Sequence, residues 1–237
     1  MLFSIIIPLF NEEKNIEKLV DEICNTNLIV LHKFEIILIN DSSTDNTLLK
    51  IKILSKKYPD IVKFINNNKN LGQSLSIVSG IKKAMYNNII TLDGDGQNNP
   101  KDISLLIKKY EQHNDVHLVS GLRKNRKDSN VKIISSKIAN KIRKKILNDD
   151  CDDTGCSLKI FDKDIFLKFP SFDGIHRFLP ALFKGYGKNV IYVNVDHRPR
   201  IHGKSKYGTL GRMFRGIRDI IKVMIIIKNL NLKDLND

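Results

Sequence analysis

The stretch Ile89-Ile90-Thr91-Leu92-Asp93-Gly94-Asp95-Gly96-Gln97 joins a short apolar run to two carboxylates that are separated by one glycine. The apolar run is typical of a buried strand, so the carboxylates are expected where that strand ends. Open α/β sheets bind ligands beyond the carboxyl ends of their strands, and two hard oxygen donors there suit Mg²⁺ or Mn²⁺ carrying a diphosphate. The alternative is a plain acidic turn, because Asp and Gly are the commonest turn residues.

Alternating strand and helix patterns surround this stretch in the first half of the chain. Strands are predicted at residues 3–7, 34–39, 61–65 and 89–92, and helices between them at residues 12–24, 45–56 and 72–85. Such alternation with short connections predicts the α/β class, with a mostly parallel sheet and helices on both faces. No GxGxxG fingerprint follows the first strand, which disfavours a nicotinamide cofactor.

Composition and charge narrow the range of partners. With 237 residues, of which 41% are hydrophobic, the chain can bury one sizeable core, or one core and a small appendage. Its formal net charge of +14 predicts an anionic partner, which could be nucleic acid, an anionic membrane or a phosphorylated substrate. Nucleic acid is disfavoured because aromatic residues make up only 7% of the chain and Trp is absent.

The N-terminus and the cysteines bear on the cellular compartment. Residues 1–8 have an apolar run without a basic start or a cleavage site, so we interpret them as a strand and not as a signal peptide. No apolar run approaches the length that spans a bilayer. Three cysteines, an odd number, argue against a disulfide framework and favour a reducing compartment, with the cytosol as the default.

Polar residues follow each predicted strand. They are Asn11-Glu12-Glu13, Asn40-Asp41-Ser42-Ser43 and Asn70-Leu71-Gly72-Gln73. Singly they could be helix caps, such as Asn11 with Glu13, or Asp45 or Ser43 ahead of the second helix. Because they converge on one edge of one sheet, next to the paired carboxylates, a nucleotide-binding crevice is the better account.

Six motifs occur in order over nearly the whole chain. They are SIIIPLFNEE (4–13), INDSSTDNT (39–47), NLGQSLSIVSGI (70–81), TLDGDGQNNP (91–100), DTGCSLKIF (153–161) and HGKSKYG (202–208). Together they resemble family 2 glycosyltransferases, which have the Rossmann-like GT-A fold. Within that family the chain is similar to dolichol-phosphate mannosyltransferases and to bacterial polyprenyl-phosphate glycosyltransferases.

The resemblance implies a sugar nucleotide in the crevice. The residues implied to contact its base, ribose or sugar are Pro8, Phe10, Asn11, Glu12, Asp41 and Gln73. The residues implied to hold Mg²⁺ or Mn²⁺ with the diphosphate are Asp93, Asp95 and Gln97. In that family a nucleoside diphosphate leaves an anomeric carbon, and the metal neutralises the charge that builds on it.

Basic side chains are expected to assist the leaving diphosphate as charge-assisted donors. The candidates are Arg123, Arg126, Arg200, Ser205 and Lys206. Arg126 lies in the charge run 123–127, which could equally be a solvated surface. The last three lie in the segment 197–208, whose glycines and single proline suit a mobile loop that folds over a diphosphate.

Asp153 is the leading candidate for a catalytic carboxylate beside Asp95. It could remove a proton or could orient the acceptor, because a lipid phosphate has a second pKa of about 6 and is already largely ionised at neutral pH. The segment Asp153-Thr154-Gly155-Cys156-Ser157-Leu158-Lys159 departs from the usual family pattern of Asp, a spacer, Thr, Ser, Gly, an aromatic and a basic residue, which leaves the acceptor contacts open.

Nearby residues receive simpler interpretations. Asp149, Asp150 and Asp152 indicate a solvated acidic turn, and Cys156 a small buried hydrophobe instead of a zinc ligand. His176 opens an apolar helix over residues 178–183 and is either structural or a contact to the acceptor.

The C-terminal segment has the pattern of a basic amphipathic helix. Its apolar residues at helical spacing are Leu210, Met213, Phe214, Ile217, Ile220, Ile221 and Met224, and its basic residues on other faces are Arg212, Arg215, Arg218 and Lys222. Such a helix either lies on an anionic membrane or packs on the catalytic domain. We expect the membrane, with a second basic segment at 132–145 alongside, a catalytic domain at 1–208 and a membrane-associating tail at 209–237.

The predicted activity is metal-dependent, inverting transfer of one sugar from GDP-mannose or a UDP-sugar to a polyprenyl (dolichyl or undecaprenyl) phosphate. We expect a peripheral enzyme at the cytoplasmic face of the membrane, bound to anionic lipid or to a membrane partner protein, without nucleic acid. The alternative is a soluble family 2 glycosyltransferase that acts on a saccharide or protein hydroxyl.

Overall fold

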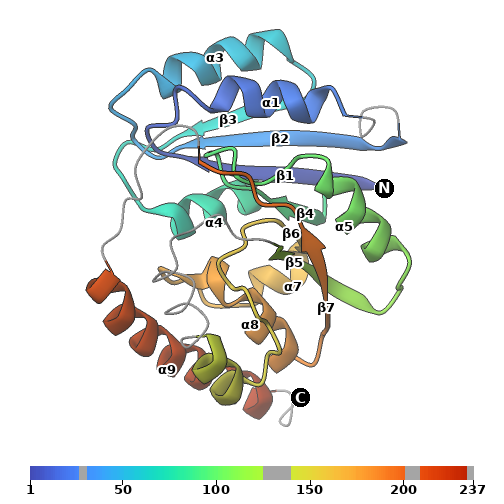
Figure 1. Cartoon of the computed structure of the whole chain (residues 1–237), viewed down its shortest axis with the longest axis vertical. Coiled ribbons are helices and arrows are strands. Elements are labelled where there is room, and N and C mark those ends of the chain that lie inside the picture. The colour runs from blue at the N-terminus through green and yellow to red at the C-terminus, as the bar shows by residue number, and fades with distance from the viewer. Residues whose placement is uncertain (27–30, 125–139, 201–208, 234–237) are drawn as a thin grey trace.

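The computed structural model describes residues 1–26, 31–124, 140–200 and 209–233, with side chains in the last range described for 216–229. Within these ranges a seven-stranded sheet has the order β3-β2-β1-β4-β6-β5-β7 (Figure 1). The strands are β1 (Leu2–Leu9), β2 (Lys33–Asn40), β3 (Val62–Asn66), β4 (Asn88–Thr91), β5 (Val116–Arg123), β6 (Lys159–Asp162) and β7 (Asn189–Val195). Only β6 runs antiparallel to its neighbours, so the predicted mostly parallel sheet is confirmed.

Helices cover both faces of the sheet, as predicted. One face is covered by α1 (Ile16–Cys24), α3 (Thr47–Lys57) and α5 (Asp102–Glu111), and the other by α4 (Gln73–Lys83), α7 (Lys163–Leu167), α8 (Leu179–Gly185) and α9 (Thr209–Lys233). Side chains alternate along β1, so that Ile5 and Ile7 pack under the first group and Ile6 under the second. Figure 1 shows α1 and α3 above the β1–β3 end of the sheet and α4 below it.

The four predicted strands become β1 to β4, with boundaries that move by one or two residues. The first predicted helix differs more, because it begins at Ile16 with Asn15 as its N-cap, and not at residue 12. Asn11 therefore does not cap it. Helix α3 begins at Thr47 with Asn46 as its N-cap residue, and Asp45, one residue earlier, accepts the backbone N–H of Thr47 on Oδ1 at 2.9 Å.

Three loops meet at the carboxyl ends of β1, β2 and β4. The backbone N–H of Asp41, just after β2, donates to the carbonyl of Leu9 at 2.8 Å, and that of Leu92, just after β4, donates to the carbonyl of Ile6 at 3.1 Å. The strands themselves are buried on both faces, as parallel strands usually are. The polar residues that follow them are therefore gathered at one edge.

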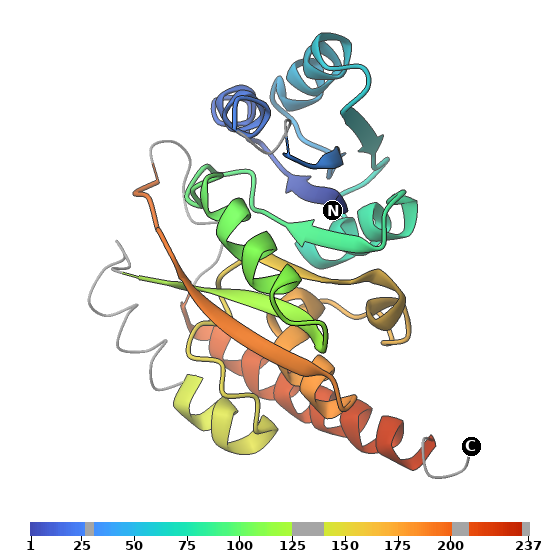
Figure 2. The ribbon, with the colours of Figure 1, turned by 90° about the vertical axis from the view of Figure 1, so that its right-hand side faces the viewer.

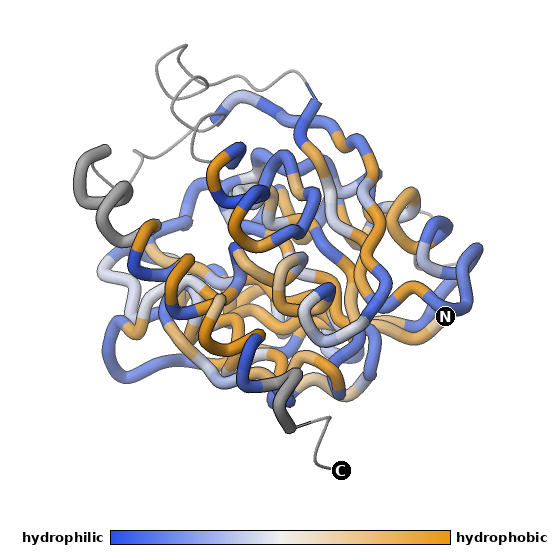
Figure 3. Tube along the Cα trace, turned by 90° about the horizontal axis from the view of Figure 1, so that it is seen from below, coloured by the Kyte–Doolittle hydropathy of each residue, from blue (hydrophilic) through white to orange (hydrophobic). Residues whose placement is uncertain are grey.

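The helix α9 crosses the underside of the molecule, with apolar and hydrophilic residues interspersed along it (Figure 3). Val223 and Ile226 are buried against the cluster that includes α8. A second row of apolar side chains is exposed, formed by Ile217, Ile221, Met224 and Ile225. The short helix at residues 140–147 lies at the same end of the molecule (Figure 1, Figure 2) and exposes Ile142 and Ile146.

In the described part of the chain, no helix combines the length and the apolar character that crossing a bilayer requires.

Candidate functional site

The loop after β4 carries the first of the two predicted carboxylates. Asp93 accepts a hydrogen bond on Oδ1 from the side-chain amide of Gln73 at 2.7 Å, and its backbone N–H donates to Ser157 Oγ at 3.2 Å. Gly94 lies against the end of β1, where a Cβ atom would stand 2.3 Å from Leu9 Cδ2. The glycine therefore lets this loop fold closely onto the sheet edge.

The second carboxylate lies beside a cation from the far end of the chain. Arg200 Nη2 forms an ion pair with Asp95 Oδ2 and lies 3.3 Å from the side-chain oxygen of Gln97. The backbone N–H of Gln97 donates to Asp95 Oδ1 at 3.1 Å, which closes a tight turn. Three residues that the sequence assigned to the metal and diphosphate are thus brought together.

The negative charge of Asp95 acts on the ionisation of Asp93. Burial, and after it the negative charge of Asp95, raises the pKa of Asp93 to about 6. The nearby cations Lys159 and Arg123 act in the opposite direction. Lys159 is almost fully buried and donates to the carbonyl of Cys156. Two neighbouring carboxylates that are partly shielded from water would bind an added cation favourably.

The residues present fit a hard divalent cation. Asp93, Asp95 and Gln97 offer oxygen ligands of the kind that Mg²⁺ and Mn²⁺ prefer. The described ranges contain no group of three or more His, Cys, Asp or Glu residues placed to hold a metal. A cation at this loop would therefore take its other ligands from a bound phosphate and from water, as Mg²⁺ commonly does.

The residues expected to hold the nucleotide lie next to this loop. Pro8 is in β1, paired with Ile39 of β2, and Phe10, Asn11 and Glu12 follow directly. We call the loop of residues 93–97 the acidic loop. The carbonyl oxygen of Pro8 lies 3.4 Å from the position that a Cβ atom on Gly94 of this loop would take. The first motif and the acidic loop are thus neighbours.

The loops after β1 and β2 are bonded to each other. Asn11 adopts a left-handed φ of 56°, its Oδ1 accepts the backbone N–H of Thr44 at 2.8 Å, and its Nδ2 donates to Thr44 Oγ1 at 3.2 Å. Glu13 Oε2 accepts the backbone N–H of Asn46 at 3.0 Å. These bonds fix the shape of the edge at which the base and ribose are expected.

Asp41 organises the start of α4. Its carboxylate accepts hydrogen bonds from Asn67 Nδ2 at 2.9 Å and from the backbone N–H groups of Leu71 at 2.8 Å and Gly72 at 2.9 Å. The next residue is Gln73, which contacts the acidic loop. Asp41 therefore has a structural task, the positioning of Gln73, besides the nucleotide contact that the family resemblance implies.

Asp153 is held by Arg123. The guanidinium donates through Nε and Nη2 to the two carboxylate oxygens, both at 2.7 Å, and the backbone N–H of Arg123 donates to Oδ2 at 3.2 Å. A Cβ on Gly155 would come within 2.6 Å of Arg123 Nη2, so the glycine makes room for the guanidinium. A carboxylate engaged in this bidentate pair is better suited to orienting a cation than to removing a proton.

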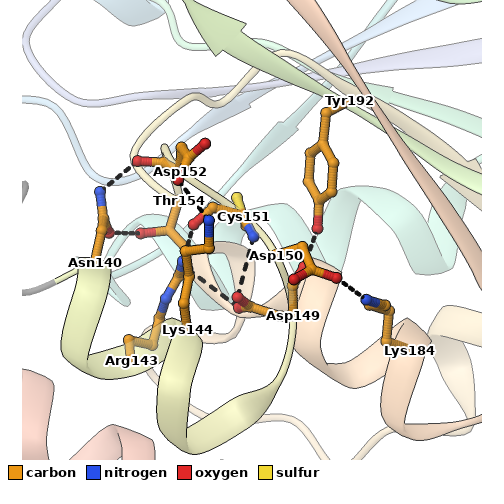
Figure 4. A network of polar contacts seen from close by, with 10 residues as sticks. All are labelled: Asn140, Arg143, Lys144, Asp149, Asp150, Cys151, Asp152, Thr154, Lys184 and Tyr192. Atoms are coloured by element: carbon orange, nitrogen blue, oxygen red, sulfur yellow. Dashed lines mark hydrogen bonds and ion pairs between the residues drawn. The ribbon is translucent and has the colours of Figure 1, made fainter.

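The turn that precedes Asp153 is anchored in the interior (Figure 4). Arg143 lies 3.2 Å from Asp149 Oδ2, both side chains being buried, and also donates to the carbonyl of Cys151. The backbone N–H of Cys151 donates to Asp149 Oδ1 at 3.2 Å, and Tyr192 donates to the carbonyl of Asp149. The expectation of a solvated acidic turn is therefore wrong for Asp149, because a buried guanidinium balances its charge.

The outer part of the same turn is exposed and paired with basic residues. Lys144 lies 2.7 Å from Asp152 Oδ1, and Asn140 donates to the Asp152 carbonyl at 2.7 Å. Lys184 of α8 forms an ion pair with Asp150. Figure 4 shows these contacts on either side of the buried pair. Residues of helix 140–147, α8 and β7 thus hold the turn that comes just before Asp153.

Cys156, on the other side of Asp153, fits the interpretation of a small hydrophobe. It is fully buried, and burial raises the pKa of its thiol to about 11.

Some predicted residues cannot be placed. Arg126, Ser205 and Lys206 lie outside the described residues, as does the part of the second basic segment before residue 140.

Ser157 and Lys159 contribute to the site but were assigned no role from the sequence. In the sequence they stand out because polar Ser157 and Lys159 alternate with the apolar residues Leu158 and Ile160, which are both buried. A lysine inside a short apolar strand needs a nearby anion or carbonyl, and that requirement could have identified it.

Comparison with known proteins gives a consistent picture. The model of the family described as glycosyl transferase family 2 matches residues 4–169. A dodecaprenyl-phosphate galacturonate synthase of Rhizobium johnstonii is 35% identical over 228 residues, covering 95% of this chain and 67% of that protein. An undecaprenyl-phosphate 4-deoxy-4-formamido-L-arabinose transferase of Shewanella sediminis is 31% identical over 205 residues. The match covers 86% of this chain and 61% of that protein. The chain spans about two thirds of the length of these curated relatives.

Solved structures share the fold. Glucosyl-3-phosphoglycerate synthase of Mycobacterium tuberculosis, in complex with Mn²⁺, UDP and phosphoglyceric acid, superposes with a TM-score of 0.70 at 14% identity, covering 95% of this chain and 78% of that one. Its complex with Mg²⁺ and UDP gives a TM-score of 0.68. At this identity the likeness establishes the fold alone, and it confirms the predicted GT-A class.

The buried pair in the turn predicts a large difference between two neighbouring substitutions. Arg143→Met leaves the Asp149 carboxylate buried without its cation, so we expect a loss of about 3–5 kcal/mol in the free energy of unfolding. Lys144→Met, on the same helix, removes an exposed ion pair and should cost less than about 1 kcal/mol. Urea unfolding of both variants measures the difference, and equal small losses would contradict the described network.

The raised pKa of Asp93 predicts how stability depends on pH. The folded-state pKa of about 6 lies above the unfolded value near 3.8, so ionising Asp93 destabilises the fold as pH rises from about 4 to about 6. Asp93→Asn should therefore be more stable than wild type at pH 8, by up to ~3 kcal/mol, and equal to it below pH ~4. The test is urea unfolding across this pH range with a chelator present. A stability difference between the two proteins that does not change with pH would show that ionisation of Asp93 is not its cause.

Proposed function

Because the chain belongs to glycosyl transferase family 2, we propose that this glycosyltransferase moves one sugar from a nucleoside diphosphate sugar to a polyprenyl phosphate. The observation that carries the donor half is the pair Asp93 and Asp95 at a sheet edge, with the guanidinium of Arg200 beside it. The acceptor half rests on the printed activities of the relatives and on the apolar and basic surface at α9.

The donor would lie along the carboxyl edge of the sheet. The loops after β1 and β2 face the base and ribose, with Phe10, Asn11 and Asp41 as contacts. A divalent cation held by Asp93 and Asp95 would neutralise charge on the departing diphosphate. Arg200 can donate hydrogen bonds to the same oxygens, since its guanidinium already lies at this loop.

The acceptor oxygen needs little activation if it belongs to a phosphate. With a second pKa of about 6, a phosphate monoester is largely ionised at neutral pH. Asp153 would then orient Arg123 toward the reacting groups, in keeping with its bidentate pair. Attack from the face opposite the diphosphate would invert the anomeric centre.

The underside of the molecule supports a membrane-bound acceptor. The exposed isoleucines of α9 and of helix 140–147 are interspersed with exposed basic residues, among them Arg218, Lys222 and Lys141. Such a surface can place apolar side chains among acyl chains and cations at headgroup phosphates. We therefore propose a catalytic unit at 1–208, a membrane-associating segment at 209–237, and action at the cytoplasmic face of a membrane.

The activity experiment measures release of nucleoside diphosphate from a panel of UDP- and GDP-sugars. It is run with Mg²⁺ or Mn²⁺, with and without a short-chain polyprenyl phosphate in liposomes. Release that requires the lipid phosphate supports the proposal and identifies the donor. Release that ignores the lipid but rises with a soluble sugar would instead favour the alternative acceptor class, a saccharide or protein hydroxyl.

Asp95→Asn should abolish this metal-dependent release while sparing the fold. The substitution keeps the size of the side chain but removes a negative charge from the metal site, so we expect at least a 100-fold loss of turnover. Asp102→Asn is the matched control, because this carboxylate lies on α5, outside the acidic loop. Full metal-dependent turnover by Asp95→Asn would contradict the metal assignment.

The proposed membrane-binding surface on α9 is tested by introducing a negative charge there. Ile221→Glu on α9 should weaken binding to vesicles of mixed zwitterionic and anionic lipid by about 10-fold or more, because it removes apolar area and adds repulsion. Leu49→Glu is the control, since Leu49 is equally exposed but lies on α3, on the opposite face of the sheet. Cosedimentation measures both, and equal binding of the two variants would contradict this surface.

A further inference from the structure

A second residue from a distant part of the chain meets the start of α4. His176 lies in the short 3₁₀ helix Ile175–Arg177, and its Nδ1 is 2.8 Å from Ser74 Oγ. The same Ser74 oxygen accepts the backbone N–H of Gly174 at 2.7 Å. Ser74 is fully buried, so all its polar contacts are with protein groups.

These contacts define which nitrogen of His176 carries the proton. Ser74 Oγ already accepts from Gly174, and its single hydroxyl proton is best placed by donating to His176 Nδ1. With Nδ1 accepting, the proton of the neutral imidazole is on Nε2. Burial, followed by the charges of Arg177 and Lys159, lowers the pKa of His176 to about 3, so the ring stays neutral near pH 7.

The Nε2 edge of the ring is the one that can reach a ligand. The Nδ1 edge faces the fully buried Ser74, whereas His176 as a residue is partly exposed. The exposed part of the ring is therefore the opposite edge, which carries the Nε2–H group.

Helix α4 connects this ring to the acidic loop. Ser74 holds His176, and the preceding residue Gln73 holds Asp93, so two consecutive residues of α4 position both groups. The ammonium of Lys159 acts to lower the pKa of both Asp93 and His176.

On its other side the 3₁₀ helix is attached to α9. Arg177 Nη2 lies 2.8 Å from Asp219 Oδ2, and Asp219 is buried. The Lys222 ammonium of α9 lies 5.0 Å from the centre of the Phe172 ring, just before the same segment. His176 thus stands between the carboxylates of the donor site and the helix assigned to the membrane surface.

We propose that His176 is an acceptor-binding residue, which donates a hydrogen bond from Nε2 to a non-attacking oxygen of the acceptor's phosphate. The inference rests on the proposed function and adds to it the group that holds the acceptor. A neutral donor suits this task, because it can orient the phosphate without adding a full positive charge that would weaken the attacking oxygen as a nucleophile.

The test compares three substitutions by steady-state kinetics with a short-chain polyprenyl phosphate. His176→Phe keeps an aromatic ring but removes the donor, and should raise the KM for the lipid phosphate about 10- to 100-fold, the effect of losing a hydrogen bond to a charged group. The KM for the nucleotide sugar should stay within about 2-fold. His176→Gln restores an N–H near the Nε2 position and should recover most of the loss.

Ser74→Ala tests how the ring is held. It should raise the KM for the lipid phosphate severalfold, because the imidazole loses the bond that sets its tautomer and orientation. Ser79→Ala is the matched control on α4, where the hydroxyl only donates to the carbonyl of Ser76, and should leave both KM values unchanged. Thermal melting and nucleotide-sugar binding confirm that each variant is folded.

Two results would overturn the inference in distinguishable ways. If wild type requires the lipid phosphate but His176→Phe keeps its KM for it, or if the Phe and Gln variants lose activity equally along with nucleotide-sugar binding, His176 is structural. If wild type itself does not respond to polyprenyl phosphate, the proposed function fails, and this inference fails with it.

Discussion

Two carboxylates held one glycine apart at the end of a buried strand are the constraint on which the site depends. Asp93 is partly desolvated beside Asp95, so the loop accumulates negative charge that the surrounding elements must balance. The balancing groups come from separate parts of the chain, with Arg200 on one side and the buried Lys159 on another. Because each of these groups is itself fixed by hydrogen bonds, the charge pattern is set before any ligand arrives. That arrangement is what a reaction with an anionic leaving group needs.

The sequence predicted the elements well where the information is local. Apolar runs located the strands β1 to β4, and their alternation with helices was enough for the α/β class, because burial on both faces demands such runs. It could not predict the pairings between loops, since Asn11 meets Thr44, and Asp153 meets Arg123, only after the sheet has assembled. The antiparallel β6 was missed because only two apolar residues lie between Lys159 and Asp162, and its direction follows only from its pairing with β4 and β5.

The residues of the candidate site differ in the same way in how far the sequence alone could identify them. Those in strand-end motifs, such as Asp93 and Gln97, are recognisable because their position follows from the local pattern. Ser74 and His176 are 102 residues apart, and the local sequence around either residue does not predict their contact. Asp149 shows the opposite error, since a cluster of acidic residues suggested solvent exposure until the structure provided the buried Arg143. Spacing predicts which face a residue takes, whereas its partner depends on tertiary structure.

The helix α9 illustrates why an amphipathic pattern has two consequences at once. Its apolar stripe is wider than one packing interface, so Val223 and Ile226 can be buried while Ile221 and Ile225 remain exposed. The inner row fixes the helix to α8, and the pair of Asp219 with Arg177 attaches it to the segment that carries His176. A helix held in this way cannot shift on a membrane without moving that segment. In an enzyme with a lipid acceptor, this attachment would keep a constant distance between the membrane surface and the group that receives the phosphate.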